Sequence, residues 1–579
     1  MRLRSYCQSG PLTTPVIVAV ALAVLVLYPP LYGLQLSGLQ TVFGYLAEDA
    51  FYYLTVAKNS TLGFVSFDRE VRTNGFHPLW QYILIASFTG LGGHDPQTEL
   101  YLSFVLGALL TAIGIVATGM SVYLVTRSAF LPFMLVPGPL YFIFSIRAGG
   151  DAIATGITYT YSPWAFMNGM ESPCSVMLGG IFLYLMTRMF LSTKQAPLGD
   201  GITERATAPS EKMMIVTGLV LALLVAARLD DIFLLMSTAL FFLLWGGQGR
   251  RRVLNLLLIV LPTVVVLGAY ALYLQWTGQP WFVVSGMVKS TSAAAFSGNM
   301  ATILCDLFPP IHHLLRPAYK VEAWDLTAAR SFALFVPTAF AVWLAALIAR
   351  AGIDGRDEFQ EIKWLLPIVI YILCKGLYNL VNVRLGSQGY WYYVLPVLMT
   401  NYLSILVSWK LFSRWRVGSL PPERNSLVFL YIVIYLFVSA NTIYSAGLGN
   451  RRLGELFKGS SEITASLKKI YPGIRLIDRT DEQYAYFLDI PAVSGLGYTL
   501  DYDGYVALKQ GKLLDYFLRR GFTVTFESPW MHPLPIPRDT YTLTEIYRHE
   551  PSGTVFSRID RAMGQNVQDL PCGAESKPR

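Results

Sequence analysis

The sequence predicts a mainly α-helical membrane protein that carries a small α/β domain at its C-terminus. Of the 579 residues, 54% are hydrophobic and only 14% are charged, whereas a soluble domain usually carries about 25% charged residues. The mean hydropathy is +0.45, and apolar runs long enough to cross a bilayer recur up to residue 446. The composition then becomes more polar. We therefore divide the chain into a transmembrane domain, residues 1–446, and an α/β domain, residues 447–579.

Charge and cysteine content exclude several other classes. The formal net charge of +8 comes from scattered basic residues, so no nucleic-acid partner is expected. The five cysteines show no CxxC spacing, so neither a zinc motif nor a dense disulfide framework is indicated. No Gly-rich phosphate loop follows a strand, which argues against a nucleotide-sugar substrate. We predict no metal site and no cofactor; the pattern does not demand a divalent cation.

The first element is a membrane helix that is retained. A basic start with Arg2 and Arg4 precedes the apolar run 14–34. No convincing cleavage site follows, and the run is longer than the core of a typical signal peptide. Further apolar runs bring the predicted total to about eleven spans. They lie at roughly 14–34, 100–125, 129–147, 172–191, 213–229, 230–247, 253–276, 331–350, 363–383, 389–409 and 427–446.

The positive-inside rule sets the orientation. The stretch 78–93 is short and ends in Gly-Gly. If it does not cross, basic clusters such as GRRR at 249–252 and WKLFSRWR at 409–416 share the side of Arg2 and Arg4. We therefore predict that 78–93 is associated with the outer leaflet and that the N-terminus is cytoplasmic. The protein is then a multi-pass protein of the cell membrane, the inner or plasma membrane.

This orientation places the large polar segments on the outer side. They are a first outer loop at 35–99, a second large outer loop at 277–330 and the extracytoplasmic C-terminal domain.

Local patterns within the C-terminal domain predict an α/β fold. Residues 461–470 have helical spacing, 473–478 and 522–527 alternate like strands, and LLDYFLRRG at 513–521 ends like a Gly-capped helix. The acidic and aromatic stretch DYDGY, 501–505, is either a surface turn or a platform for a sugar.

An acidic pair lies in the first outer loop. In the stretch YLAEDAFYYLTVAKN, residues 45–59, Glu48 and Asp49 precede a helical pattern in which Asp49, Tyr52 and Tyr53 share a face. One interpretation is an interfacial helix that its acidic N-terminus stabilises. The other is a general base that takes a proton from an acceptor hydroxyl.

The stretch FDREVRTNGFHPLWQ, residues 67–81, follows the acidic pair. Asn74-Gly75 is a turn signal, and His77 must be extended because it precedes Pro78. A plain turn into a membrane helix explains this pattern. A cleft with both signs of charge also explains it, with Asn74 binding substrate and His77 binding the phosphate of a donor.

Charged residues at the outer ends of later spans extend the candidate site. Glu171 in NGMES begins a span, where an ionisable group either caps the helix or marks a functional site. Arg228 and Asp230 flank a tight outer turn. They form a simple surface ion pair, or they bind a donor phosphate and a substrate, respectively.

Two cations and a tyrosine are further candidates for binding a lipid phosphate. Lys289 lies in the Ser/Gly-rich stretch SGMVKSTSAAAFSG, which supplies positive charge and hydroxyl donors; a solvated loop lysine is the alternative. Arg384 precedes GSQGYWYYVLP, and we expect it to bind the phosphate together with Tyr392. An interfacial aromatic belt is the alternative for these tyrosines.

Together, these motifs resemble the GT-C superfamily of membrane glycosyltransferases. More narrowly, they resemble bacterial proteins with a DDAFYY…ARN…TNGFHPLW pattern. The matching pieces here are EDAFYYLTVAKN, TNGFHPLWQ, NGMES, ARLDDIF, SGMVKS, YWYYVLP and GYTLDYDGY…GKLLDYFLRRGF. Each motif is short, so their order and spacing along most of the chain carry the resemblance. The arabinofuranosyltransferases are more distantly similar, with an acidic pair after the first span and a C-terminal outer domain.

The resemblance implies a GT-C-like fold and a hexosyl- or pentosyltransferase of cell-envelope polysaccharide biosynthesis. The donor would be a polyprenyl-phosphate-linked sugar, and the acceptor a glycan, a lipid or a protein at the outer face. An acidic residue of the first outer loop is then the base, which maps to Asp49 with Glu48 beside it. The chain departs from the pattern because its first acid is Glu.

A transporter or flippase of a lipid-linked or polar substrate is the alternative function. Such a protein places its ionisable groups near the bilayer midplane, often in paired repeats with broken helices. Here the charged candidates gather toward one face, and the sequence shows no internal repeat.

Overall fold

The computed structural model describes residues of both predicted domains. The described residues are 13–47, 49–61, 63–90, 95–136, 166–194, 210–247, 249–281, 283–284, 337–350, 363–382, 390–414, 435–436, 451–478, 483–495, 500–527, 536–537 and 539–561.

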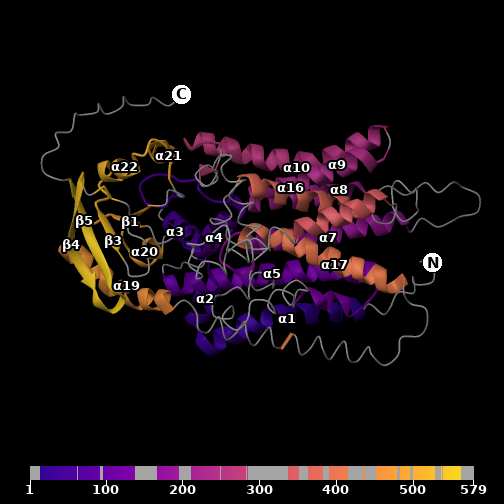
Figure 1. Cartoon of the computed structure of the whole chain (residues 1–579), viewed down its shortest axis with the longest axis horizontal. Helices are drawn as coiled ribbons and strands as arrows, with labels where there is room; N and C mark the ends of the chain where they lie inside the picture. The colour runs from indigo at the N-terminus through magenta and orange to yellow at the C-terminus, as the bar shows by residue number, and fades with distance from the viewer. Residues whose placement is uncertain are drawn as a thin grey trace, which may run out of the picture.

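The transmembrane part is a bundle of long helices that runs along the long axis of the molecule. Figure 1 shows the bundle at one end, the sheet at the other, and α3 and α4 between them. The helices are α1 (Thr13–Ser37), α2 (Leu39–Tyr45), α3 (Ala50–Ser60), α4 (Pro78–Gly90), α5 (Pro96–Thr126), α7 (Ser172–Lys194), α8 (Glu211–Ala227), α9 (Ile232–Trp245), α10 (Gly249–Trp276), α16 (Leu366–Asn382) and α17 (Val394–Arg414). Short 3-10 helices are η2 (Leu131–Leu135), η5 (Leu229–Asp231), η7 (Lys363–Leu365) and η9 (Tyr390–Tyr393).

The predicted spans coincide with apolar helices where the structure describes them. Among the described residues, 5 helices are long and apolar enough to cross a membrane: Thr13–Ser37, Pro96–Thr126, Ser172–Leu191, Gly249–Trp276 and Lys363–Val381. Shorter apolar helices occupy Pro337–Arg350 and Val394–Lys410, and α8 and α9 form a hairpin at the predicted 213–229 and 230–247. The predicted spans 129–147 and 427–446 lie largely outside the described residues.

Helices α1 and α5 pack antiparallel, so the chain leaves and rejoins the bundle on one face. Gly38 lies beside the Tyr101 hydroxyl at one end of this pair, and Gly119 lies against Leu22 further along. We call the end with Gly38 and Tyr101 the site face. The intervening α4 has 13 residues. At about 1.5 Å per residue it is about 20 Å long, too short for a bilayer core of about 30 Å, so α4 does not take the chain across.

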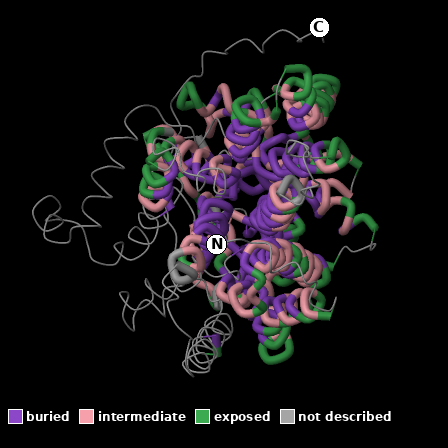
Figure 2. The backbone as a smooth tube through the Cα atoms, turned by 90° about the vertical axis from the view of Figure 1, so that its right-hand side faces the viewer, coloured by how far each residue is buried: buried purple, intermediate pink, exposed green. Residues whose placement is uncertain are grey.

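The bundle is buried at its centre and apolar on its outside. Figure 2 shows buried residues toward the middle and exposed residues around the rim. Large apolar side chains on the outer helices remain exposed, among them Ile17 (64%) on α1 and Val264 (59%), Val265 (59%) and Leu272 (68%) on α10. A continuous apolar exterior is the surface that a helix presents to lipid, which is consistent with a membrane protein.

The C-terminal domain is a five-stranded mixed sheet with helices around it. The strands β1 (Leu476–Asp478), β2 (Ala492–Ser494), β3 (Val524–Glu527), β4 (Tyr541–His549) and β5 (Thr554–Arg561) have the order β2-β1-β3-β5-β4. β1 pairs in parallel with β2 and β3, and β5 pairs antiparallel with β3 and β4. The helices are α19 (Arg451–Ile470), α20 (Gln483–Phe487), α21 (Tyr502–Lys509) and α22 (Leu513–Arg519).

The prediction of a helical bundle with a C-terminal α/β domain is confirmed. Helix α19 contains the predicted 461–470, β1 and β3 lie within their predicted ranges, and α22 ends just before Gly521, whose φ is 79°. Of the two alternatives for 501–505, the surface turn is wrong, and the sugar platform stays a prediction. Asp501 is the N-cap of α21 and accepts a hydrogen bond from the Gly504 N–H, so the residues that follow it are helical.

Candidate functional site

Charged side chains from separate segments of the bundle meet near its site face. Together with a tyrosine of α3, they come from the turns before α4 and α7, the turn between α8 and α9, the middle of α16, and η9 before α17. We call the set the charged cluster; it consists of Tyr53, His77, Glu171, Arg228, Asp230, Asp231, Tyr371, Lys375 and Tyr392.

Glu171 is at the centre of the charged cluster. One carboxylate oxygen accepts a hydrogen bond from the Tyr53 hydroxyl at 2.9 Å. The other lies 3.3 Å from the Arg228 guanidinium and 3.7 Å from His77 Nε2. The Glu171 side chain is only 2% exposed. A carboxylate at such a depth needs these partners, because an unpaired buried charge strongly destabilises a fold.

The turn before α7 holds Glu171 against the start of α3. The Ala47 N–H donates to the Asn168 carbonyl at 2.9 Å. Gly169 has a φ of 76°, and a methyl group there would lie 2.9 Å from the Ala50 Cβ. Only glycine fits this backbone conformation and this close approach. The NGMES motif is therefore needed for packing on α3 as well as for the contacts of Glu171.

The turn between α8 and α9 continues the cluster into α16. Arg228 Nε lies 2.9 Å from Asp230 Oδ1, and the guanidinium carbon lies 4.8 Å from the centre of the Tyr392 ring. Lys375 Nζ lies 2.5 Å from Asp230 Oδ2 and 3.4 Å from Asp231 Oδ1. Cations and carboxylates thus alternate, and each buried charge has an opposite charge beside it.

The sequence prediction missed the contribution of α16. Lys375 is 1% exposed, and the Tyr371 hydroxyl donates to Asp231 at 2.7 Å. Tyr371 and Lys375 are four residues apart and share one face of the helix. A lysine inside the predicted span 363–383 is itself a signal of function, but the prediction considered only the ends of the spans.

His77 reaches the cluster from the turn before α4. Its backbone N–H donates to the Tyr53 hydroxyl at 3.3 Å, and its Nδ1 accepts a hydrogen bond from the Leu229 N–H at 3.4 Å. With Nδ1 as the acceptor, a neutral imidazole carries its proton on Nε2, the nitrogen that faces Glu171. The His77 side chain is 24% exposed, so it lies at the edge of the cluster.

Burial and charge act differently on the pKa values of His77 and Glu171. Burial lowers the pKa of His77 more than the nearby Glu171 raises it. Burial raises the pKa of Glu171, but the charge of a protonated His77, the Arg228 guanidinium and the hydrogen bonds that the carboxylate accepts together outweigh burial, so this pKa lies below its ordinary value. At neutral pH the cluster therefore holds an ionised Glu171 next to a neutral imidazole.

Asn74 connects the first outer loop to the segment that follows α10. Its side-chain N–H donates to the Pro280 carbonyl at 2.9 Å, and its side-chain oxygen accepts a hydrogen bond from the Val284 N–H at 3.4 Å. Asn74 is fully buried. These contacts give it a role in holding two loops together, and its predicted contact with substrate stays a prediction.

Asp49 begins α3, and its side chain makes no capping hydrogen bond to that helix. Tyr52 and Tyr53 follow one turn later, with ring centres 4.3 Å apart. Burial, Tyr53, Glu171 and Asp49 all raise the pKa of Tyr52, so both carboxylates lie near this ring. Asp49 is half-buried whereas Glu171 is buried. Asp49 is therefore the more accessible of the two carboxylates.

Glu48, Lys289 and Arg384, which complete the predicted site, lie outside the described residues. Within the described ranges, no group of three or more His, Cys, Asp or Glu side chains is arranged to hold a metal ion. The Tyr392 ring packs against the Arg228 guanidinium. Its predicted contact with a phosphate stays a prediction.

Comparison with protein-family models gave no match, and comparison with curated proteins gave none either. Among solved structures, the chain is similar to the oligosaccharyltransferase of Archaeoglobus fulgidus. The crystal structure tethered with an acceptor peptide containing the NVT sequon has a TM-score of 0.47 and 13% identity over 95% of this chain and 74% of that chain. The apo form has a TM-score of 0.46 and 14% identity over 96% and 75%.

The same enzyme, named AglB, in complex with an inhibitory peptide and a dolichol-phosphate has a TM-score of 0.43 and 12% identity over 96% of this chain and 75% of that chain. With TM-scores below 0.5, too little geometry is shared for the activity of that enzyme to carry over to this chain.

Proposed function

We propose that this protein is a membrane glycosyltransferase that moves a sugar from a polyprenyl-phosphate donor to an acceptor hydroxyl at the outer face. The observation that supports this most is the charged cluster, in which Arg228 and Lys375 are fixed between carboxylates. Its Glu171 lies near the Tyr52 ring, as the half-buried Asp49 does. Five of the seven motifs that resemble GT-C enzymes, namely EDAFYYLTVAKN, TNGFHPLWQ, NGMES, ARLDDIF and YWYYVLP, contain residues of this cluster or of α3. Both lines of support come from this chain's own residues.

Asp49 is the base in this proposal. The acceptor hydroxyl gives its proton to the Asp49 carboxylate as its oxygen attacks the anomeric carbon. The bond between that carbon and the phosphate oxygen breaks, and its electron pair leaves with the lipid phosphate, so the configuration inverts. Glu171 is less suited to this role, because Tyr53 and Arg228 already engage its two oxygens.

Negative charge grows on the departing phosphate, so fixed cations nearby lower the barrier. Arg228 is held rigidly, but Glu171 and Asp230 already compensate its charge. Additional cations are therefore needed, and we assign this role to Lys289 and Arg384. Lys289 follows Val284, which Asn74 binds, by five residues in the sequence, and Arg384 follows the end of α16 by two.

The site face is the outer face in this proposal. Lipid-linked donors present their phosphate at the membrane surface. Figure 1 shows α3 between the bundle and the C-terminal domain, and Tyr53 of α3 donates to Glu171 of the cluster. The N-terminus is then cytoplasmic, and the C-terminal domain is extracytoplasmic.

The test is Asp49→Asn in the full-length protein, purified in nanodiscs. The substrates are a panel of synthetic undecaprenyl-phosphate hexoses and pentoses with a cell-envelope glycan fraction as acceptor, and mass spectrometry follows the release of undecaprenyl phosphate. Loss of a general base should reduce the rate by about 10²–10⁴-fold. Glu48→Gln in parallel decides which carboxylate of the pair is the base.

Asp539→Asn is the matched control, since Asp539 is an exposed acid of the C-terminal domain outside every candidate site and should leave the rate unchanged. Normal rates in both Asp49→Asn and Glu48→Gln would refute the base assignment. A wild-type protein that moves a fluorescent lipid-linked sugar between leaflets without cleaving it would support the transporter alternative instead.

A further inference from the structure

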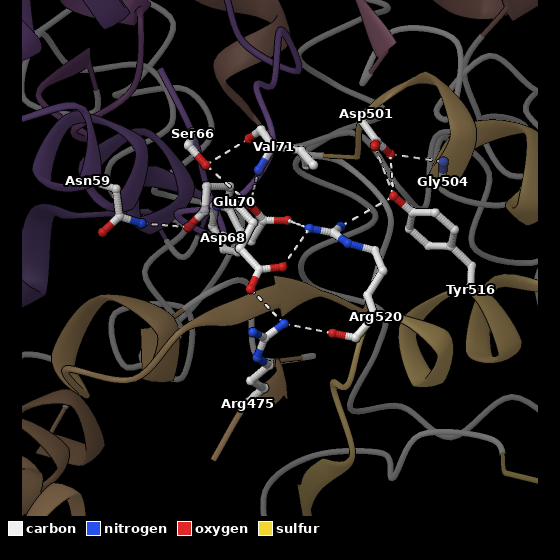
Figure 3. Close-up of polar contacts among 11 residues, drawn as sticks. Asn59, Ser66, Asp68, Glu70, Val71, Arg475, Asp501, Gly504, Tyr516 and Arg520 are labelled. Carbon is white, nitrogen blue, oxygen red and sulfur yellow. Dashed lines mark hydrogen bonds and ion pairs between the residues drawn. The ribbon is translucent and has the colours of Figure 1, made fainter. Parts of the chain in front are cut away.

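The first outer loop is bonded to the C-terminal domain by two arginines and two carboxylates. Arg520 Nη2, at the end of α22, lies 2.6 Å from Asp68 Oδ2 and 3.2 Å from Glu70 Oε2. Arg475 Nη1, just before β1, lies 2.5 Å from Glu70 Oε1. Figure 3 shows these side chains pointing toward one another across the two parts of the chain. We call Asp68, Glu70, Arg475 and Arg520 the clamp.

Asp68 connects the clamp to the backbone of the loop. While Oδ2 binds Arg520, Oδ1 accepts hydrogen bonds from the Glu70 and Val71 N–H groups, each at 2.9 Å, and from the Ser66 hydroxyl at 3.1 Å. Asp68 is 4% exposed. Arg520 therefore binds a carboxylate that already shapes the turn, and holding this side chain holds the turn itself.

The arginines are fixed on their own side as well. The Tyr516 hydroxyl donates to the Asp501 carboxylate at 2.7 and 2.8 Å and accepts a hydrogen bond from Arg520 Nη1 at 3.2 Å. Arg475 Nη1 also donates to the Arg520 carbonyl at 2.7 Å. Side chains that are held in place before they meet a partner lose less entropy when they bind it.

The clamped turn is joined to the end of α3. The Asn59 side-chain N–H donates to the Phe67 carbonyl at 2.5 Å, and Arg69 Nε donates to the Asn59 side-chain oxygen at 3.0 Å. Arg69 has a φ of 68°, a conformation that a residue with a Cβ adopts only when its surroundings require it. Its guanidinium lies 3.0 Å from Asp489 of the C-terminal domain.

The C-terminal domain also contacts α3 itself. The Phe51 ring packs against the rings of Tyr486 and Phe487 of α20, with centres 5.6 and 5.4 Å apart. The Lys58 ammonium donates to the Tyr486 carbonyl at 2.9 Å. On the opposite side, the Tyr53 hydroxyl donates to Glu171. Helix α3 therefore lies between the C-terminal domain and the charged cluster.

We propose that Arg520 and Arg475 are positioning residues for the transfer reaction, which fix the turn 66–71 and so the helix that begins with Asp49. The effect on kcat rests on the proposed function, whereas the effect on hydrogen–deuterium exchange does not. The consequence of this positioning is that the C-terminal domain belongs to the catalytic unit, since it holds the helix that presents the base.

The experiment compares Arg520→Ala with Arg519→Ala in the full-length protein. Arg519 is the exposed neighbour on α22, and among the described residues no ion pair joins it to the loop. Hydrogen–deuterium exchange of residues 50–77 and donor kinetics are measured on the same samples. In Arg520→Ala, the amides of residues 50–77 should exchange about 10-fold faster than in the wild type. The same variant should lower kcat about 10-fold with little change in the KM of the donor, whereas Arg519→Ala should match the wild type.

Swapping the charges of Glu70 and Arg475 gives a second test that does not depend on one variant folding well. Arg475→Glu alone should speed the hydrogen–deuterium exchange of residues 50–77 and lower kcat. Adding Glu70→Arg should bring both the exchange rate and kcat part of the way back to the wild-type values. Unchanged exchange in Arg520→Ala overturns the clamp whatever the activity is, and faster exchange at unchanged kcat overturns the positioning role. A wild type that transfers no sugar refutes the proposed function, while the exchange data still decide the clamp.

Discussion

Asp49 and Glu171 lie near the same tyrosine ring, yet their surroundings give them different chemistry. Glu171 is buried with both carboxylate oxygens engaged, which stabilises its ionised form. Asp49 is half-buried and makes no capping hydrogen bond to α3. In the proposed mechanism, a deeply buried carboxylate positions its neighbours, whereas a more accessible one can take a proton from a hydroxyl. Burial, and not residue type, is what distinguishes the two acids in this proposal.

Acidification should destabilise the protein through His77. Burial lowers the pKa of His77 in the folded protein, so the unfolded chain takes up a proton first as the pH falls. The stability associated with His77 is therefore intact above pH about 6.5 and is lost below it, until the lower pKa of the folded state is reached. His77→Asn removes this effect. Thermal unfolding in detergent at pH about 7.5 and about 5.5 should show a smaller drop in Tm for the variant than for the wild type, and equal drops would contradict the assignment.

Helices α5 and α7 hold their positions through contacts between backbones. A methyl group on Gly114 would overlap the Val176 backbone, and one on Gly180 would overlap the Gly114 carbonyl. A buried set of hydroxyls adds to this packing, since Ser121 donates to Tyr402 of α17 at 2.9 Å. Small residues and hydroxyl hydrogen bonds are the usual means by which membrane helices associate. This packing fixes the position of α7 against α5 and therefore helps to place Glu171, which directly precedes α7.

Gly180→Ala should destabilise the bundle, because the added methyl group forces α5 and α7 apart. Overpacking of this kind costs about 1–3 kcal/mol. Gly268→Ala on α10 is the matched control: nothing lies within 4 Å of a methyl group there, and replacing a helical glycine stabilises by about 0.4–1 kcal/mol. Thermal unfolding of both purified variants checks this. A Tm for Gly180→Ala at or above that of Gly268→Ala would show that the two helices do not approach as closely as described.

Helix α3 lies between the C-terminal domain and the helix bundle (Figure 1), and its Tyr53 donates to Glu171 of the charged cluster. The first outer loop begins and ends at the site face of the bundle, because α1 and α5 are antiparallel and α4 is too short to cross. The start of α10, with its run of arginines, follows α9 at the opposite end of the bundle. A separation of basic residues and catalytic candidates onto opposite ends is what the positive-inside rule predicts for an outward-facing enzyme.

A cysteine introduced at each end of the molecule should therefore react with a labelling reagent from opposite sides of the membrane. Arg251 on α10 and Lys458 on α19 are both exposed, so cysteine at either position is accessible to a reagent on its own side. We expect Lys458→Cys to react with a membrane-impermeant maleimide on intact spheroplasts, and Arg251→Cys to react only after permeabilisation. The wild type measures the background from the native cysteines. Labelling of both variants from one side would overturn the topology.

Local patterns were sufficient to predict most of the elements. Span positions follow from apolar length, and the helix before Gly521 follows from its C-terminal glycine, because both depend on neighbouring residues in the sequence. The DYDGY stretch shows the limit of such patterns. Its turn-forming residues fit an N-cap equally well, and Asp501 uses its side chain to start α21.

The sequence by itself determined that this chain is a helical membrane protein with a C-terminal α/β domain, and it singled out Glu171, Arg228, Asp230 and His77 one at a time. Only the tertiary structure decided that these four side chains meet, that Lys375 joins them from inside a span, and that α3 lies between the cluster and the C-terminal domain. The reason is physical. Apolar length and turn chemistry are properties of neighbouring residues, whereas the partner of a buried charge is set by which helices pack together.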